Sequence, residues 1–176
     1  MSGKHYPARE RRFAPWKNGG GETAEIVCHP EGAGFDDFLW RISTAKVERS
    51  GPFSAFPGID RVLTVIEGGS MDLCFEDGTV LHCTPQSGPH PFAGEAACDA
   101  VLHEEGLLDL NLMVRSPLRG AVYQPGEAVP KGPVRGAWLF ALSDGEMAKH
   151  DLKEVAVPPE VPEGTLLIVV SDGTLQ

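Results

Sequence analysis

The sequence predicts an all-β protein, folded as an antiparallel sandwich or barrel. Apolar and polar residues alternate with a period of two from residue 23 to about residue 122, which is typical of half-buried strands. The 176 residues include 21 glycines and 15 prolines, as expected when many short strands are joined by turns. No segment carries a strong helical pattern, so a helical bundle is not expected.

The clearest strands lie in the first two thirds of the chain. They are predicted at residues 38–45, 61–66, 71–75, 80–83, 100–103 and 108–115. Asp77-Gly78 predicts a two-residue hairpin turn between the third and fourth of these. That register places residue 74 opposite residue 81 and residue 83 opposite residue 72, so that His82 shares a face with Met71 and Leu73.

Beyond Pro117 the alternation is sparser. Residues 137–142 and 165–170 read as buried strands, whereas residues 149–157 are ambiguous. The boundary between two β units is predicted within residues 117–131. We therefore expect an N-terminal β unit over residues 1–120 and a C-terminal β unit over residues 121–176 that completes the barrel or packs on it.

Charge and composition limit the partners. The net charge of −10 argues against nucleic acid, because phosphates require a positive surface. No apolar run approaches the roughly 20 residues that span a membrane, and the charged segment at residues 1–12 lacks the apolar stretch of a signal peptide. A cytoplasmic protein is expected. Its four cysteines form no CxxC pair and are expected to stay reduced.

The histidines give no metal signature. The six of them are scattered, with no H-x-H or H-E-x-x-H pair, so no metal site is predicted. On the hairpin register above, His82 is a core residue. His90 lies on a predicted loop, where it could act as acid or base. Neither a phosphate-binding loop nor a dinucleotide fingerprint is present, and no cofactor is expected.

The run from Trp16 to Thr23 contains three consecutive glycines flanked by an aromatic ring, a cation, an amide and a hydroxyl. Glycine permits positive φ and a close approach of the main chain to a ligand. The run is either one wall of a binding pocket, to which Lys17 and Asn18 contribute, or a glycine-rich connection whose Trp16 fills the core.

Polar residues also follow two strands. Arg41 and Ser43 share one face of residues 38–45, and Asp109, Asn111 and Arg115 share one face of residues 108–115. These faces are either the solvent side of a sheet or the lining of a barrel interior, and the sequence leaves both open. If they face inward, Arg41 offers a guanidinium fork for carboxylate and Asn111 offers both donor and acceptor.

The loop at residues 50–61 joins this set. Pro52, Pro57 and two glycines predict a rigid double turn, with Phe53 and Phe56 as anchors. Arg61, which begins the next strand, either pairs locally with Asp60 or forms a second anion-binding fork at a cavity mouth.

Five motifs follow one another in an order that resembles the HutD/Ves family. They are Pro15-Trp16-Lys17-Asn18-Gly19-Gly20-Gly21, residues 40–45 (WRISTA), residues 51–61 (GPFS followed by FPGIDR), residues 92–95 (FAGE) and residues 109–113 (DLNLM). The resemblance covers residues 10–120. It implies a cupin-type double-stranded β-helix, double or elaborated, without the usual cupin metal ligands. It also implies an accessory or regulatory role in histidine utilisation for HutD members and a link to cold and stress responses for Ves members.

By position, the resemblance gives seven pocket candidates: Lys17, Asn18, Arg41, Ser43, Arg61, Asn111 and Met113. The leading hypothesis is a metal-free protein that binds a small carboxylate metabolite, with a homodimer left open. One alternative is a metal-independent isomerase or lyase that uses Lys17 or His90 as proton shuttle. Another is a protein-interaction module whose cavity is vestigial and whose interior is closed and apolar.

Overall fold

The structure is a computed structural model that describes residues 3–173, and it is built almost entirely from antiparallel strands. The single helix among these residues is a 3-10 turn at Ala8–Glu10, so the all-β prediction is confirmed. No helix in this part of the chain has the length and apolar character needed to cross a membrane. The chain divides into two compact units: an N-terminal unit, residues 12–116, and a C-terminal unit, residues 3–11 with 117–173.

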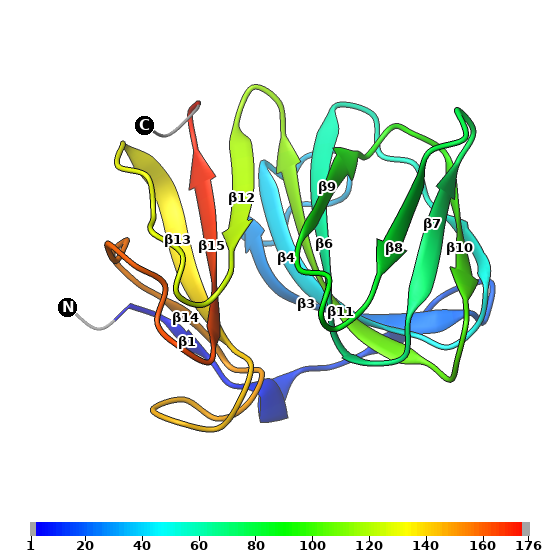
Figure 1. The fold of residues 1–176 in the computed structure, drawn as a ribbon. Helices are drawn as coiled ribbons and strands as arrows, with labels where there is room; N and C mark the ends of the chain where they lie inside the picture. Colours follow the sequence, from blue (N-terminus) through cyan, green and yellow to red (C-terminus); the bar gives the residue numbers. More distant parts are fainter. Residues whose placement is uncertain (1–2, 174–176) are drawn as a thin grey trace. The chain divides into compact units, whose positions relative to one another are not determined.

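The N-terminal unit is a sandwich of two antiparallel sheets (Figure 1). The six-stranded sheet has the order β2-β3-β4-β11-β6-β9. Its strands are β2 (Ala14–Pro15), β3 (Gly21–His29), β4 (Trp40–Val47), β11 (Leu107–Arg115), β6 (Ile59–Gly68) and β9 (His90–Ala93). The four-stranded sheet has the order β5-β10-β7-β8. Its strands are β5 (Gly51–Phe53), β10 (Cys98–Leu102), β7 (Met71–Phe75) and β8 (Val80–Cys83).

The C-terminal unit is one five-stranded sheet of order β1-β14-β13-β15-β12. Its strands are β1 (His5–Tyr6), β14 (Leu152–Glu154), β13 (Val134–Ala141), β15 (Thr165–Ser171) and β12 (Arg119–Tyr123). The expected units, 1–120 and 121–176, differ from this division in two places. Residues 3–11 join the C-terminal unit because β1 pairs with β14, and a boundary after residue 120 would cut β12.

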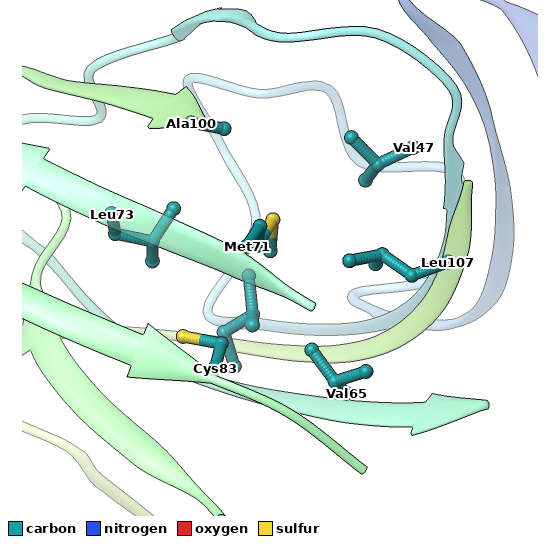
Figure 2. Packing of buried hydrophobic residues seen from close by; sticks show 8 residues of the cluster. Val47, Val65, Met71, Leu73, Cys83, Ala100 and Leu107 are labelled. Carbon is teal, nitrogen blue, oxygen red and sulfur yellow. The ribbon is translucent and has the colours of Figure 1, made fainter. Parts of the chain in front are cut away.

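A hydrophobic core lies between the two sheets (Figure 2). Val47, Leu63, Val65 and Leu107 come from the six-stranded sheet, and Met71, Leu73, Cys83 and Ala100 come from the four-stranded sheet. All eight are buried. Burying an aliphatic side chain of this size stabilises a fold by about 1.5–3 kcal/mol, so this cluster holds the two sheets together.

The β7–β8 hairpin has a register one residue away from the predicted one. Phe75 N donates to Thr79 O across a loop of residues 76–78, and Gly78 has φ +91°. A three-residue loop with glycine in the left-handed region therefore replaces the predicted two-residue turn. Met71 then faces Cys83 and Asp72 faces His82. The prediction that His82 is a core residue is wrong: its side chain is 62% exposed. All four cysteines are free, as predicted.

Candidate functional site

The interior of the sandwich changes from apolar to polar along its central strands. The face of β4 that carries Val47 in the core carries Ser43 and then Arg41 further along, since alternate residues of a strand share a face. The pairing of β11 with both neighbours places Met113 between Arg41 and Arg61. The polar faces that the sequence left open therefore point inward.

At the polar end lies a cavity of about 540 Å³, within the range of small-molecule sites. All seven pocket candidates line it: Lys17, Asn18, Arg41, Ser43, Arg61, Asn111 and Met113. The lining also includes Trp16, Phe35, Phe53, Phe56 and Asp109, which the candidate set left out. The structure thus brings the predicted residues together, while ligand binding by them stays a prediction.

Arg61 is the most deeply placed cation of the cavity, at 5% exposure. Its Nε and Nη2 both donate to Oδ1 of Asn111, at 3.4 and 3.3 Å. The guanidinium carbon lies 5.7, 5.6 and 5.1 Å from the ring centroids of Phe53, Phe56 and Phe92. Burial lowers the pKa of Arg61 to about 10, so the group is still protonated at neutral pH. The phenyl rings stabilise that charge through their π faces.

Arg41 supplies the second cation. Its Nε donates to Oε1 of Glu25 at 3.0 Å, and its Nη1 lies 3.4 Å from Oγ of Ser43. The guanidinium also lies over the ring of Phe35, 5.2 Å from the centroid. These contacts fix the guanidinium at the cavity wall, and Glu25 already offsets part of its charge.

Asp109 lines the cavity but is not one of the seven residues that the sequence analysis selected as pocket candidates. It is 1% exposed, and neither carboxylate oxygen makes a hydrogen bond of good geometry within residues 3–173. Burial raises the pKa of Asp109 to about 7, against the influence of Arg61, which favours the charged form. The sequence did contain one indication of this position, because Asp109 and Asn111 are two residues apart on the same strand and therefore share a face. An acid that is about half protonated at pH 7 therefore lies in the same wall as two arginines.

The residues that flank the three glycines also line the cavity: Trp16, Lys17, Asn18 and Thr23. Trp16 Nε1 donates to Thr23 Oγ1 at 2.7 Å, and Gly20 N donates to Asn18 Oδ1 at 2.8 Å. Trp16 also meets Phe53 edge-to-face, with 6.1 Å between ring centroids. A Cβ on Gly21 would lie only 2.3 Å from the carbonyl oxygen of Lys46. The main chain is therefore packed too closely here for any larger residue.

His90 does not join the cavity. It begins β9, its Nε2 lies 2.8 Å from Ser87 Oγ, and burial lowers its pKa. Of residues 3–173, those that line the cavity include neither histidine nor cysteine. The expected proton shuttle through His90 thus has no geometric basis in the cavity.

The comparisons with known proteins identify the relatives of this chain. The family model described as HutD matches residues 8–156, which extends past the five motifs into the C-terminal unit. Protein Ves of Citrobacter koseri is 38% identical over 115 residues, which is 64% of this chain and 58% of that protein. An uncharacterised 21.2 kDa protein encoded in the hutC 3′ region of Pseudomonas putida is 40% identical over 56% of this chain and 51% of that protein. The matched part is thus little more than half of each relative.

The solved structures agree with the sequence matches. HutD from Pseudomonas fluorescens SBW25, crystallised in a formate condition, superposes with a TM-score of 0.80 at 26% identity, covering 96% of this chain and 97% of that one. The cupin-type fold is confirmed as a β-sandwich, although strand pairing closes no barrel in residues 3–173. The family model spans most of the chain, and its match agrees with both the relatives and the fold. This chain belongs to the HutD family.

Proposed function

We propose that this protein binds a small carboxylate metabolite in the cavity and serves as an accessory or regulatory component of histidine utilisation. The observation that carries the proposal is the meeting of Arg41, Arg61 and Asn111 on one wall of the cavity, beside Asp109, whose pKa is raised to about 7. Guanidinium groups present paired N–H donors that match the two oxygens of a carboxylate.

The charge balance of the wall supports an anionic ligand. Arg61 is buried, and Asp109, the acid nearest to it in electrostatic influence, is largely protonated below pH 7. The positive charge of Arg61 is then offset mainly by phenyl faces and one amide oxygen. A ligand carboxylate would supply the missing negative charge in a site of low polarity, where such pairing is strongest. A protonated Asp109 could also donate a hydrogen bond to a ligand oxygen.

The histidine-utilisation part rests on the relatives. One relative is named HutD, and another is encoded in the hutC 3′ region. A cytoplasmic location, where such metabolites are processed, belongs to the same proposal. The interaction-module alternative expected a closed apolar interior, and a wall with Arg41, Arg61 and Asp109 gives it no support.

Titration calorimetry with histidine, urocanate, glutamate and formate tests the proposal, and glutamine, which keeps the α-carboxylate but has an amide in place of the side-chain carboxylate, shows which carboxylate of glutamate is bound. We expect at least one carboxylate to bind and Arg41→Ala and Arg61→Ala each to weaken it at least tenfold. Arg135→Ala is the control, because that arginine pairs with Asp172 on the surface of the C-terminal unit. Unchanged affinity in both cavity variants would exclude this assignment.

A second candidate is a metal-independent isomerase or lyase. The feature that favours it is Asp109, because a pKa near 7 suits a group that both takes and gives a proton at neutral pH. Lys17, which also lines the cavity, is its partner in this reading. Turnover of any of the four compounds that is lost in Asp109→Asn would favour the enzyme, and binding without turnover would favour the accessory role.

A further inference from the structure

A second group of polar side chains lies on the other sheet of the N-terminal unit. His82 Nδ1 is 2.5 Å from Asp72 Oδ1, and His103 Nε2 is 2.8 Å from Asp72 Oδ2. The three ligand atoms all lie within 4.8 Å of one another. Two imidazoles thus converge on the two oxygens of one carboxylate.

The backbone fixes this arrangement. Asp72 on β7 is directly opposite His82 on β8. His103 follows β10, which pairs with the other edge of β7, and its N–H donates to the carbonyl of Ser70 at 3.1 Å. Two of the three side chains therefore come from the adjacent strands β7 and β8, and His103 comes from the residue that directly follows β10, the neighbour of β7 on its other side (Figure 1). Rigid strands place ligands more reproducibly than loops do, which favours a preorganised site.

The group is separate from the cavity. Met71 and Leu73 point into the sandwich core, so Asp72 between them points to the outer face of the sheet. The side chains of Asp72, His82 and His103 are 24%, 62% and 42% exposed, and an ion in solution can reach them. None of the three is among the cavity-lining residues within the described part of the chain.

We propose that Asp72, His82 and His103 form a binding site for a divalent transition metal ion such as Zn²⁺. Two imidazole nitrogens and a carboxylate oxygen are a ligand set that Zn²⁺ uses with water as the fourth ligand. Bonds of about 2.0–2.2 Å place neighbouring ligand atoms of a tetrahedral ion about 3.3 Å apart. The present spacings reach that value with shifts of about 1 Å, which exposed side chains make by small rotations.

Binding replaces the present hydrogen bonds. In the metal-free state the two ring nitrogens nearest Asp72 direct N–H groups at its oxygens. Each ring then offers that nitrogen's lone pair to the ion, while its proton resides on the other ring nitrogen, as metal-bound histidine requires. The ion would join β7, β8 and β10 through their side chains.

Titration of the full chain with Zn²⁺ after chelator treatment tests this proposal. We expect one Zn²⁺ per chain and a rise in melting temperature with Zn²⁺ concentration. His82→Ala and His103→Ala should each weaken binding at least tenfold, and the double variant should abolish it. Cys74→Ser and His29→Ala are controls that should retain wild-type affinity, since Cys74 lies on the same strand as Asp72 but is not among the three ligands, and His29 lies on the other sheet.

Side-chain NMR of the wild-type protein gives a readout that does not depend on variants. Zn²⁺ should shift the ring signals of His82 and His103 and leave those of His29, on the other sheet, in place. Absence of Zn²⁺ binding, or undiminished affinity in the double variant, would overturn the metal site. It would leave Asp72 as an acid held by two hydrogen bonds. Neither result bears on carboxylate binding in the cavity.

Discussion

Asn111 Oδ1 accepts hydrogen bonds from both Nε and Nη2 of Arg61, so one amide oxygen orients a buried guanidinium. The two residues are not directly opposite each other, because Met113 is the partner of Arg61 and Leu63 is the partner of Asn111. The contact is therefore diagonal across neighbouring strands. It turns the guanidinium edge toward β11 and fixes where a ligand can meet Arg61.

Replacing Asn111 with leucine should destabilise the protein. The substitution removes the only hydrogen-bond acceptor that residues 3–173 give to the Arg61 side chain, and a buried charged group without its acceptor costs about 1–3 kcal/mol. Urea denaturation measures the loss. Asn111→Asp is the informative comparison, since it restores an acceptor but adds a negative charge. It should keep the fold and abolish carboxylate binding.

Asp109 predicts a pH dependence of stability. Its pKa is raised to about 7 in the folded state, above its ordinary value, so the folded protein binds the proton more tightly. Its stabilising contribution is complete below about pH 4 and is lost as the pH rises through 7. Asp109→Asn should not show this loss. Denaturation at pH 5 and pH 8 should therefore reveal a stability difference between variant and wild type that grows by on the order of 2–4 kcal/mol. A constant difference would contradict the prediction.

The same group should control affinity for carboxylates. As Asp109 ionises above pH 7, its charge neutralises Arg61 and repels an anion, so binding should weaken by about tenfold between pH 6.5 and 8.5. Calorimetry at the two pH values measures this. Asp109→Asn should bind equally well at both, and a wild-type protein with pH-independent affinity would show that Asp109 does not influence the ligand.

Gly21 should tolerate no side chain. Its alanine variant would bring Cβ to 2.3 Å from the backbone carbonyl oxygen of Lys46 and 3.2 Å from the Trp16 ring. Because backbone cannot move as easily as a flexible side chain, we expect a destabilisation of about 1–3 kcal/mol and a displaced Trp16. Melting temperature and tryptophan fluorescence report both effects. Gly51→Ala, which meets nothing within 4 Å, is the control that should change neither.

The cysteines should differ in reactivity. Burial raises the pKa of the Cys83 thiol to about 12, whereas Cys74 is only partly buried on the other face of the hairpin. Because the thiolate is the reactive form, Cys83 should react far more slowly with iodoacetamide in the folded protein. Mass spectrometry after timed alkylation separates the two sites. Equal rates would indicate that the hairpin opens readily or has the other register.

The sequence predicted the cavity better than the hairpin. The alternation in β4 assigned Arg41 and Ser43 to one face, and the alternation in β11 assigned Asn111 to one face of that strand. The pairing of the two strands then brings these two faces side by side. Which face turned inward was not predictable, since the opposite faces of both strands are also buried. Asp109 had the right parity, but the sequence carries no sign of how little water reaches it.

The group of Asp72, His82 and His103 on the outer face of the sheet was missed for a different reason. A turn one residue longer than predicted reverses the face of every residue in β8, so His82 was assigned to the core. His103, just after β10, lies 31 positions after Asp72 in the chain, and no local pattern reports such a pairing. Long-range register is set by the whole sheet.

The length of the loop at residues 76–78 thus determines which side chains of β8 face the core and which face solvent. Its length places a thiol in the core and an imidazole in solvent. Deleting one residue of the loop would exchange the two positions. The His82 ring would then enter the hydrophobic core of Figure 2, and the Cys83 sulfur would face solvent. Changing the length of this turn, without changing any side chain in the strands, would therefore replace an imidazole by a thiol on the outer face of the β7–β8 hairpin and make that face sensitive to oxidation.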